Sequence, residues 1–103
     1  MNKPNYYATI PADVRYDKNL TPNSKLLYAE ITALSQKDGS CWASNKYFSK
    51  LYNVSTVTIS RWVSSLVENN FINREIVYKK GTKEIDKRYL QLCNGDINKN
   101  VND

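Results

Sequence analysis

The chain has 103 residues, of which 41% are hydrophobic, and it carries a net charge of +5. Its length suffices for one domain with a modest core, and no apolar run approaches the roughly 18 residues that span a bilayer. Its two cysteines, Cys41 and Cys93, lie far apart and the chain has no histidine, which argues against a disulfide framework and a Cys/His zinc site. The opening residues contain no apolar stretch typical of a signal peptide. We therefore expect a soluble, cytoplasmic protein with reduced thiols, Cys41 partly buried, and no metal, cofactor or membrane partner.

The first third of the chain predicts one clear helix. Residues 6–10 have β character, and residues 12–19 are rich in polar turn formers and predict little regular structure. Thr21 followed by Pro22 is typical of a helix start, with the threonine as N-cap and the proline at the first helical position. Leucine and isoleucine then recur at helical spacing until the helix stops near Gln36, where a Lys-Asp-Gly turn follows.

Two further helices are predicted in the middle of the chain, separated by a tight turn. The segment 40–43 is short and could pair as a brief strand. Ser44 is a plausible N-cap for a short helix that ends at Asn53, a residue type that tolerates the left-handed conformation of a helix end. Ser55 caps the next helix, which should run to about Asn70.

The hydrophobic period then changes from helical to alternating, which predicts a β-hairpin. We expect strands at residues 71–78 and 85–92, joined by a lysine-rich turn at 79–83. Residues 94–103 are polar and predict a disordered tail or linker. The domain should therefore span residues 1–93.

The helix that follows Ser55 has an unusual outward face. Its apolar residues, including Ile59 and Leu66, form one stripe, and Val57, Arg61 and Ser64 lie opposite. β-branched and hydroxyl residues are poor helix formers, so stability alone does not explain them. Small side chains permit close approach, an arginine can donate to a guanine edge, and a valine can contact a thymine methyl. The pattern favours a surface built for contact with DNA.

At this point the chain resembles a known family, the winged helix-turn-helix domains. The segment NVSTVTISRWVSSLVENNFINRE resembles their recognition helix and first wing strand, although Asn53 and Asn69-Asn70 stand where glycine is common. The segment IPADVRYDKNLTPNSKLLYAEITAL resembles more narrowly the N-terminal domains of phage and plasmid replication-initiation proteins. Together they cover roughly residues 6–93. The resemblance implies a mainly α fold with a small β-hairpin, three helices plus a wing, and sequence-specific binding of double-stranded DNA, most narrowly at a replication origin.

The candidate binding residues fall into three groups. By resemblance, recognition-helix contacts would fall on Ser55, Thr56, Val57, Ser60, Arg61 and Ser64, and wing contacts on Lys79, Lys80, Thr82 and Lys83. Free backbone N–H groups and the helix dipole at the start of the short helix favour an anion, which makes residues there candidates for phosphate contacts. The backbone candidates on this short helix are Ser44, Asn45, Lys46 and Lys50.

Several alternatives stay open. The outward helix face could be an ordinary solvated surface, and the lysine-rich turn could simply aid solubility. The aromatic residues Tyr28, Trp42, Tyr47, Tyr52 and Trp62 are expected to pack in or beside the core. A transcriptional regulator of the same fold and a protein-interaction module are rival functions, and a homodimer, a further domain or replication proteins are open as partners. The scattered carboxylates and the absence of histidine give no support for an enzyme.

Overall fold

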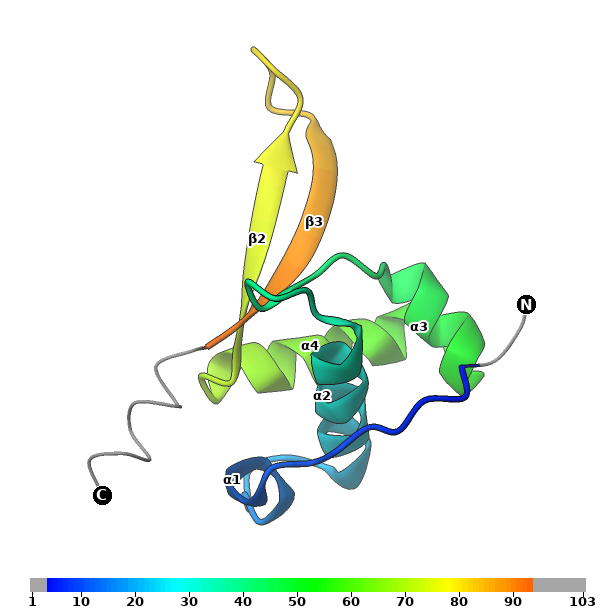
Figure 1. Ribbon diagram of the computed structural model, residues 1–103. Helices are drawn as coiled ribbons and strands as arrows, with labels where there is room; N and C mark the ends of the chain where they lie inside the picture. The colour runs from blue at the N-terminus through cyan, green and yellow to red at the C-terminus, as the bar shows by residue number, and fades with distance from the viewer. Residues whose placement is uncertain (1–3, 94–103) are drawn as a thin grey trace.

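A computed structural model describes residues 4–93, so the predicted tail at 94–103 lies outside the described residues. Four helices and a three-stranded antiparallel sheet make up the described part, with the strands in the order β1-β3-β2 (Figure 1). In chain order the elements are α1 (Ala12–Arg15), α2 (Pro22–Leu34), β1 (Ser40–Cys41), α3 (Asn45–Tyr52), α4 (Thr56–Glu68), β2 (Ile72–Tyr78) and β3 (Ile85–Leu92). The fold is a winged helix, mainly α with a small sheet, as the sequence predicts.

Side-chain caps begin the three longer helices where the sequence predicts them. The side-chain oxygens of Thr21, Ser44 and Ser55 each accept a backbone N–H three residues ahead, at 3.2, 3.0 and 3.1 Å. Each cap satisfies one of the N–H groups that have no partner within the helix. Asn53 ends α3 in the left-handed conformation, with φ 56° and ψ 49°. The tight turn between α3 and α4 is therefore confirmed in its backbone geometry.

The N-terminal region differs from the prediction. Residues 6–10 form no strand, and residues 12–15 form the one-turn helix α1 instead of irregular structure. In α1 the carbonyl of Pro11 accepts from the N–H groups of Val14 and Arg15 at 3.1 and 2.8 Å. Val14 is fully buried, so tertiary packing stabilises a turn that its polar neighbours do not predict.

Two helices end before their predicted limits. α2 stops at Leu34, because the hydroxyl and the backbone N–H of Ser35 donate to the carbonyls of Ile31 and Thr32, which caps the last turn. α4 stops at Glu68, two residues before the predicted limit of about Asn70. Asn70 has φ 68°, a left-handed conformation that turns the chain from the helix into β2.

The core lies where α2, α3 and α4 meet the base of the sheet. Its fully buried side chains come from every layer: Val14, Leu27, Ile31, Cys41, Phe48, Ile59, Leu66, Ile72 and Leu90. Cys41 is therefore completely buried, not partly buried as predicted, because β1 pairs it with Leu90 of β3. The core holds the stripe of α4 predicted to face inward, and it leaves the opposite stripe outside.

The β2–β3 hairpin is the wing. It pairs from Ile72↔Leu92 at the base to Tyr78↔Ile85 near the tip, with a register shift between Val77 and Tyr78. The base is buried, whereas the side chains of β2 beyond Ile72 are exposed. Figure 1 shows the outer part of the hairpin projecting beyond the helices. Such an arm contributes little to the core and is available for other contacts.

Candidate nucleic-acid interface

The outward face of α4 is exposed over its first two turns. Val57 is 58% exposed, and Thr56, Ser60 and Arg61 are also exposed, whereas Ile59 on the opposite side is fully buried. The cap residue Ser55 is exposed too, and its hydroxyl donates to the Thr58 hydroxyl at 3.0 Å while accepting from the Thr58 N–H. The predicted accessibility of Val57 and Arg61 is confirmed. Ser55 serves first as the cap that starts the helix.

Ser64 differs from the other predicted residues of this face. It is half-buried, and its hydroxyl accepts a hydrogen bond from Nη2 of Arg74 in β2 at 2.9 Å. Residues 57, 60 and 64 lie on one side of the helix because their spacing follows the helical period. The contact therefore ties the wing to the end of the exposed stripe. Ser64 is an anchor for the wing in this structure, not an open contact position.

The start of α3 is also partly occupied. Asn45 is half-buried, and its side-chain carbonyl accepts from Nη2 of Arg88 in β3. Ser44 is exposed and caps the helix by accepting the N–H of Tyr47. Lys46 and Lys50 are exposed one turn apart, as their spacing predicts. The structure thus leaves the two lysines and Ser44 accessible and engages the Asn45 side chain with the wing.

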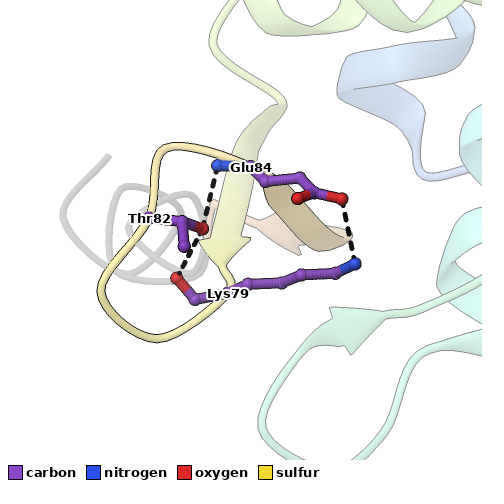
Figure 2. Close-up of polar contacts among 3 residues, drawn as sticks. All are labelled: Lys79, Thr82 and Glu84. Atoms are coloured by element: carbon purple, nitrogen blue, oxygen red, sulfur yellow. Dashed lines mark hydrogen bonds and ion pairs between the residues drawn. The ribbon is translucent and has the colours of Figure 1, made fainter.

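The wing tip has an internal network of polar contacts, shown in Figure 2. Nζ of Lys79 lies 3.0 Å from Oε1 of Glu84, and the Thr82 hydroxyl donates to the Lys79 carbonyl while accepting the Glu84 N–H. Gly81 supplies the left-handed residue of the turn, with φ 74°. Lys79 and Thr82 thus shape the tip. Lys80 and Lys83 are exposed and are not part of this network.

Two arginines on the helix-facing side of the wing were not among the predicted binding residues. Arg74 pairs with the buried Leu90 across the strands, and Arg88 pairs with Ile76, so both lie on the face that carries the core residues. Nη1 of Arg88 is buried and has no hydrogen-bond partner within residues 4–93. Burial lowers the pKa of Arg88, and the nearby charge of Arg74 lowers it further. The alternation of side chains along the two strands would have predicted that both arginines lie on this face. It would not have identified Ser64 and Asn45 as their hydrogen-bond partners on the helices.

A groove of about 590 Å³ lies beside Arg88, between the residues before α3 and the first half of β3. Trp42, Ser44 and residues 85–88 line it. Trp42 is 42% exposed, more than predicted for a packing residue, and its ring stacks on Tyr89 with centroids 4.5 Å apart. Its indole N–H donates to the hydroxyl of Ser40 at 3.2 Å. Trp42 is therefore held by polar and ring contacts at the surface and not by the core.

The other predicted aromatic packing residues are half-buried, and one of them joins a polar cluster. Glu30 of α2 accepts from the hydroxyl of Tyr52 at 3.0 Å and from the hydroxyl of Tyr6. Burial, followed by the charge and the hydrogen bond of Glu30, raises the pKa of Tyr52. This cluster fastens residue 6 to α2, which explains why the N-terminal segment runs along the helices and does not join the sheet.

Metal and membrane sites find no support in the described part of the chain. Residues 4–93 contain no group of three side chains suited to hold a metal ion. None of the helices within the same range is both long and apolar enough to cross a bilayer.

Comparisons with known proteins agree with this architecture. Residues 18–72, which run from the turn after α1 to the first residue of β2, match the family model of a helix-turn-helix domain. A chain from a solved "Structure of Rep-DNA complex" superposes with a TM-score of 0.56 at 17% identity, covering 94% of this chain and 88% of that one. No curated protein matches the sequence. The structural likeness is one of fold, whereas the family match covers more than half of the sequence. The chain belongs to the helix-turn-helix domain family, and its β-hairpin makes it a winged member.

Proposed function

We propose that this domain binds double-stranded DNA in a sequence-specific manner through α4. The exposed residues Thr56, Val57, Ser60 and Arg61 would enter the major groove, and the wing tip would lie along phosphates or a minor groove. The observation that carries the proposal is the exposed stripe of small side chains with one arginine, on the second helix of a helix-turn-helix unit. A helix selected for stability alone would carry better helix formers there.

In its narrower form, the proposal assigns the domain to origin binding in phage or plasmid replication initiation. The resemblance of residues 10–34 to replication initiators supports this role. The fold that the domain shares with a chain of a Rep–DNA complex supports it as well. The positions of the bound sites would separate this role from transcriptional repression, since an initiator binds repeats in an origin and a repressor binds beside a promoter.

Selection from a pool of random DNA duplexes tests the broader proposal. We expect a defined motif and binding that weakens as salt rises, because phosphate contacts release counterions. Absence of salt-sensitive binding even at low ionic strength would refute DNA binding and favour a protein-interaction module.

Substitution of Arg61 tests the role of α4. Arg61→Ala should weaken binding to the selected duplex by about 1–3 kcal/mol and relax specificity at one position. The side chain is exposed, so the fold should be unaffected. Titration of wild type and variant on matched and scrambled duplexes measures the effect, and equal losses on both would remove the base-reading role of Arg61.

Substitution of Lys80 tests the role of the wing tip. Lys80→Ala should weaken binding to all duplexes alike and reduce the salt slope by about one unit. Lys79→Ala is the matched control, because Lys79 is already paired with Glu84 and should contribute less to phosphate binding. If the two variants behave alike, the tip pairing does not influence DNA contact.

A further inference from the structure

The junction between the wing and the helices carries two arginines, Arg74 and Arg88, and no ion pair joins either of them to a carboxylate among residues 4–93. Arg74 donates to the hydroxyl of Ser64, and Arg88 donates to the side-chain carbonyl of Asn45, so both arginines have neutral partners. Within residues 4–93, the ion pair present is Lys79–Glu84, at the far end of the hairpin. Burial lowers the pKa of Arg88, and the charge of Arg74 contributes to the same direction. An anion bound between the wing and the helices would neutralise part of this positive charge.

The hydrogen-bonding capacity of Arg88 is only partly used. One of its terminal nitrogens, Nη1, is buried and lacks a hydrogen-bond partner among the described residues. A buried donor that has lost water without gaining an acceptor destabilises the state that contains it. The free protein therefore holds Arg88 in a position that a new acceptor could improve.

The groove beside Arg88 offers room for such an acceptor. Arg88 and Ser44 both line it, and its volume is about 590 Å³. The first N–H groups of α3 follow Ser44, and N–H groups at a helix start favour negative charge. Asp86 also lines the groove, but no ion pair joins it to Arg88 in the part of the chain that the structure describes. Arg88 of β3 and Ser44, the cap residue before α3, thus line the same groove from two separate segments of the chain.

We propose that Arg88 exchanges its contact with Asn45 for one backbone phosphate of bound DNA, which is seated in this groove at the start of α3. The inference rests on the proposed binding of duplex DNA and deepens it by naming a phosphate contact outside α4 and the wing tip. The planar fork of a guanidinium presents two parallel donors that match two phosphate oxygens. Nη1 gains its missing acceptor in this exchange, whereas a contact to Asn45 uses only Nη2.

The test compares Arg88→Met with Lys18→Met in the full 103-residue chain. Lys18 is an exposed residue in the turn after α1, and α1 lies at the opposite end of the molecule from the wing tip in Figure 1. Both substitutions remove one positive charge. Affinity for a random-sequence duplex is measured over a range of salt concentrations, and the thermal midpoint of each protein is measured without DNA.

Arg88→Met should bind the duplex about tenfold more weakly, the loss expected for one charge-assisted contact, and its salt slope should fall by about one unit. Lys18→Met should have the duplex affinity and the salt slope of the wild type. The thermal midpoint of Arg88→Met should stay level or rise, because replacing an incompletely paired buried charge by an apolar chain is often neutral or stabilising. This combination separates a phosphate contact from a structural role.

The remaining outcomes overturn the inference. If Arg88→Met binds the duplex as tightly as the wild type does, Arg88 does not contact a phosphate. The proposed function would remain valid in that case, because the wild type still binds DNA. A fall of more than about 5 °C in its thermal midpoint would show that Arg88 serves the fold in its present position. If inorganic phosphate at constant ionic strength stabilises the wild type but Arg88→Met binds DNA normally, the groove takes free phosphate and not DNA. Failure of the wild type to bind any duplex would remove the proposed function and the inference together.

Discussion

The left-handed Asn53 at the turn between α3 and α4 gives a quantitative prediction about stability. Its φ of 56° and ψ of 49° place its Cβ against the following carbonyl, and its backbone N–H donates to the carbonyl of Ser49. The left-handed conformation costs a residue with a Cβ about 1–2 kcal/mol of conformational free energy. The cost is smaller for asparagine, because its short polar side chain can form hydrogen bonds with the nearby backbone. Asn53→Ala should therefore lower the free energy of unfolding by about 1 kcal/mol, which shifts the thermal midpoint by about 4–8 °C in a domain of this size.

Glycine at the same position separates two opposing effects. Asn53→Gly removes the Cβ clash, but glycine also gains freedom in the unfolded chain, worth about 0.4–1 kcal/mol. The two effects offset each other, so this variant should lie within about 0.5 kcal/mol of wild type.

Urea denaturation followed by circular dichroism measures these differences. Asn23→Ala is the matched control, since Asn23 is exposed in the right-handed helix α2, where alanine is the better helix former. The reasoning is refuted if Asn53→Ala is as stable as the wild type, or if Asn23→Ala lowers the free energy of unfolding as much as Asn53→Ala does.

Two further predictions concern titratable groups near β1. Hydrogen bonds from the hydroxyl and then the N–H of Ser40 lower the pKa of Asp38, so the carboxylate is preferred in the folded state. Its contribution to stability should be complete above the unfolded pKa of about 3.9 and be lost as pH falls through the lower folded pKa. The denaturation midpoint of Asp38→Ala should consequently fall less steeply in acid than that of wild type, and parallel curves would contradict this. Burial raises the pKa of the Cys41 thiol, so a thiol reagent should modify it only as fast as the protein opens. Modification of Cys41 in native buffer at the rate of a free peptide thiol would show that the β1–β3 pairing does not protect it.

Local sequence signals were sufficient for the main helices and for the tight turn. Thr21, Ser44 and Ser55 act through N–H groups three residues away, and Asn53 closes the helix before it. Such contacts depend on near neighbours in the chain, so they can be read from a short segment. The period of the apolar residues in α4 likewise predicted the exposed stripe that contains Val57 and Arg61.

Local signals were insufficient where distant packing determines the backbone. The polar residues around Val14 predict no helix, yet α1 forms because this one apolar side chain is buried beneath α2. The β character of residues 6–10 predicts a strand, yet Tyr6 is bonded to Glu30, which is 24 positions away. Propensity is a weak guide in such short segments, because tertiary contacts contribute more free energy than local preference.

By itself, the sequence determined the order of the three longer helices and the hairpin, the caps, the left-handed turn and the exposed face of α4, because each depends on residues within a few positions of one another. Only the tertiary structure decided which polar side chains remain accessible. Strand register brings Arg74 to Ser64 and Arg88 to Asn45, across separations of 10 and 43 residues. Hairpin pairing likewise engages Lys79 with Glu84 and leaves Lys80 outside that network. The spatial meeting of residues distant in sequence depends on how the sheet packs against the helices, and no local pattern records that packing.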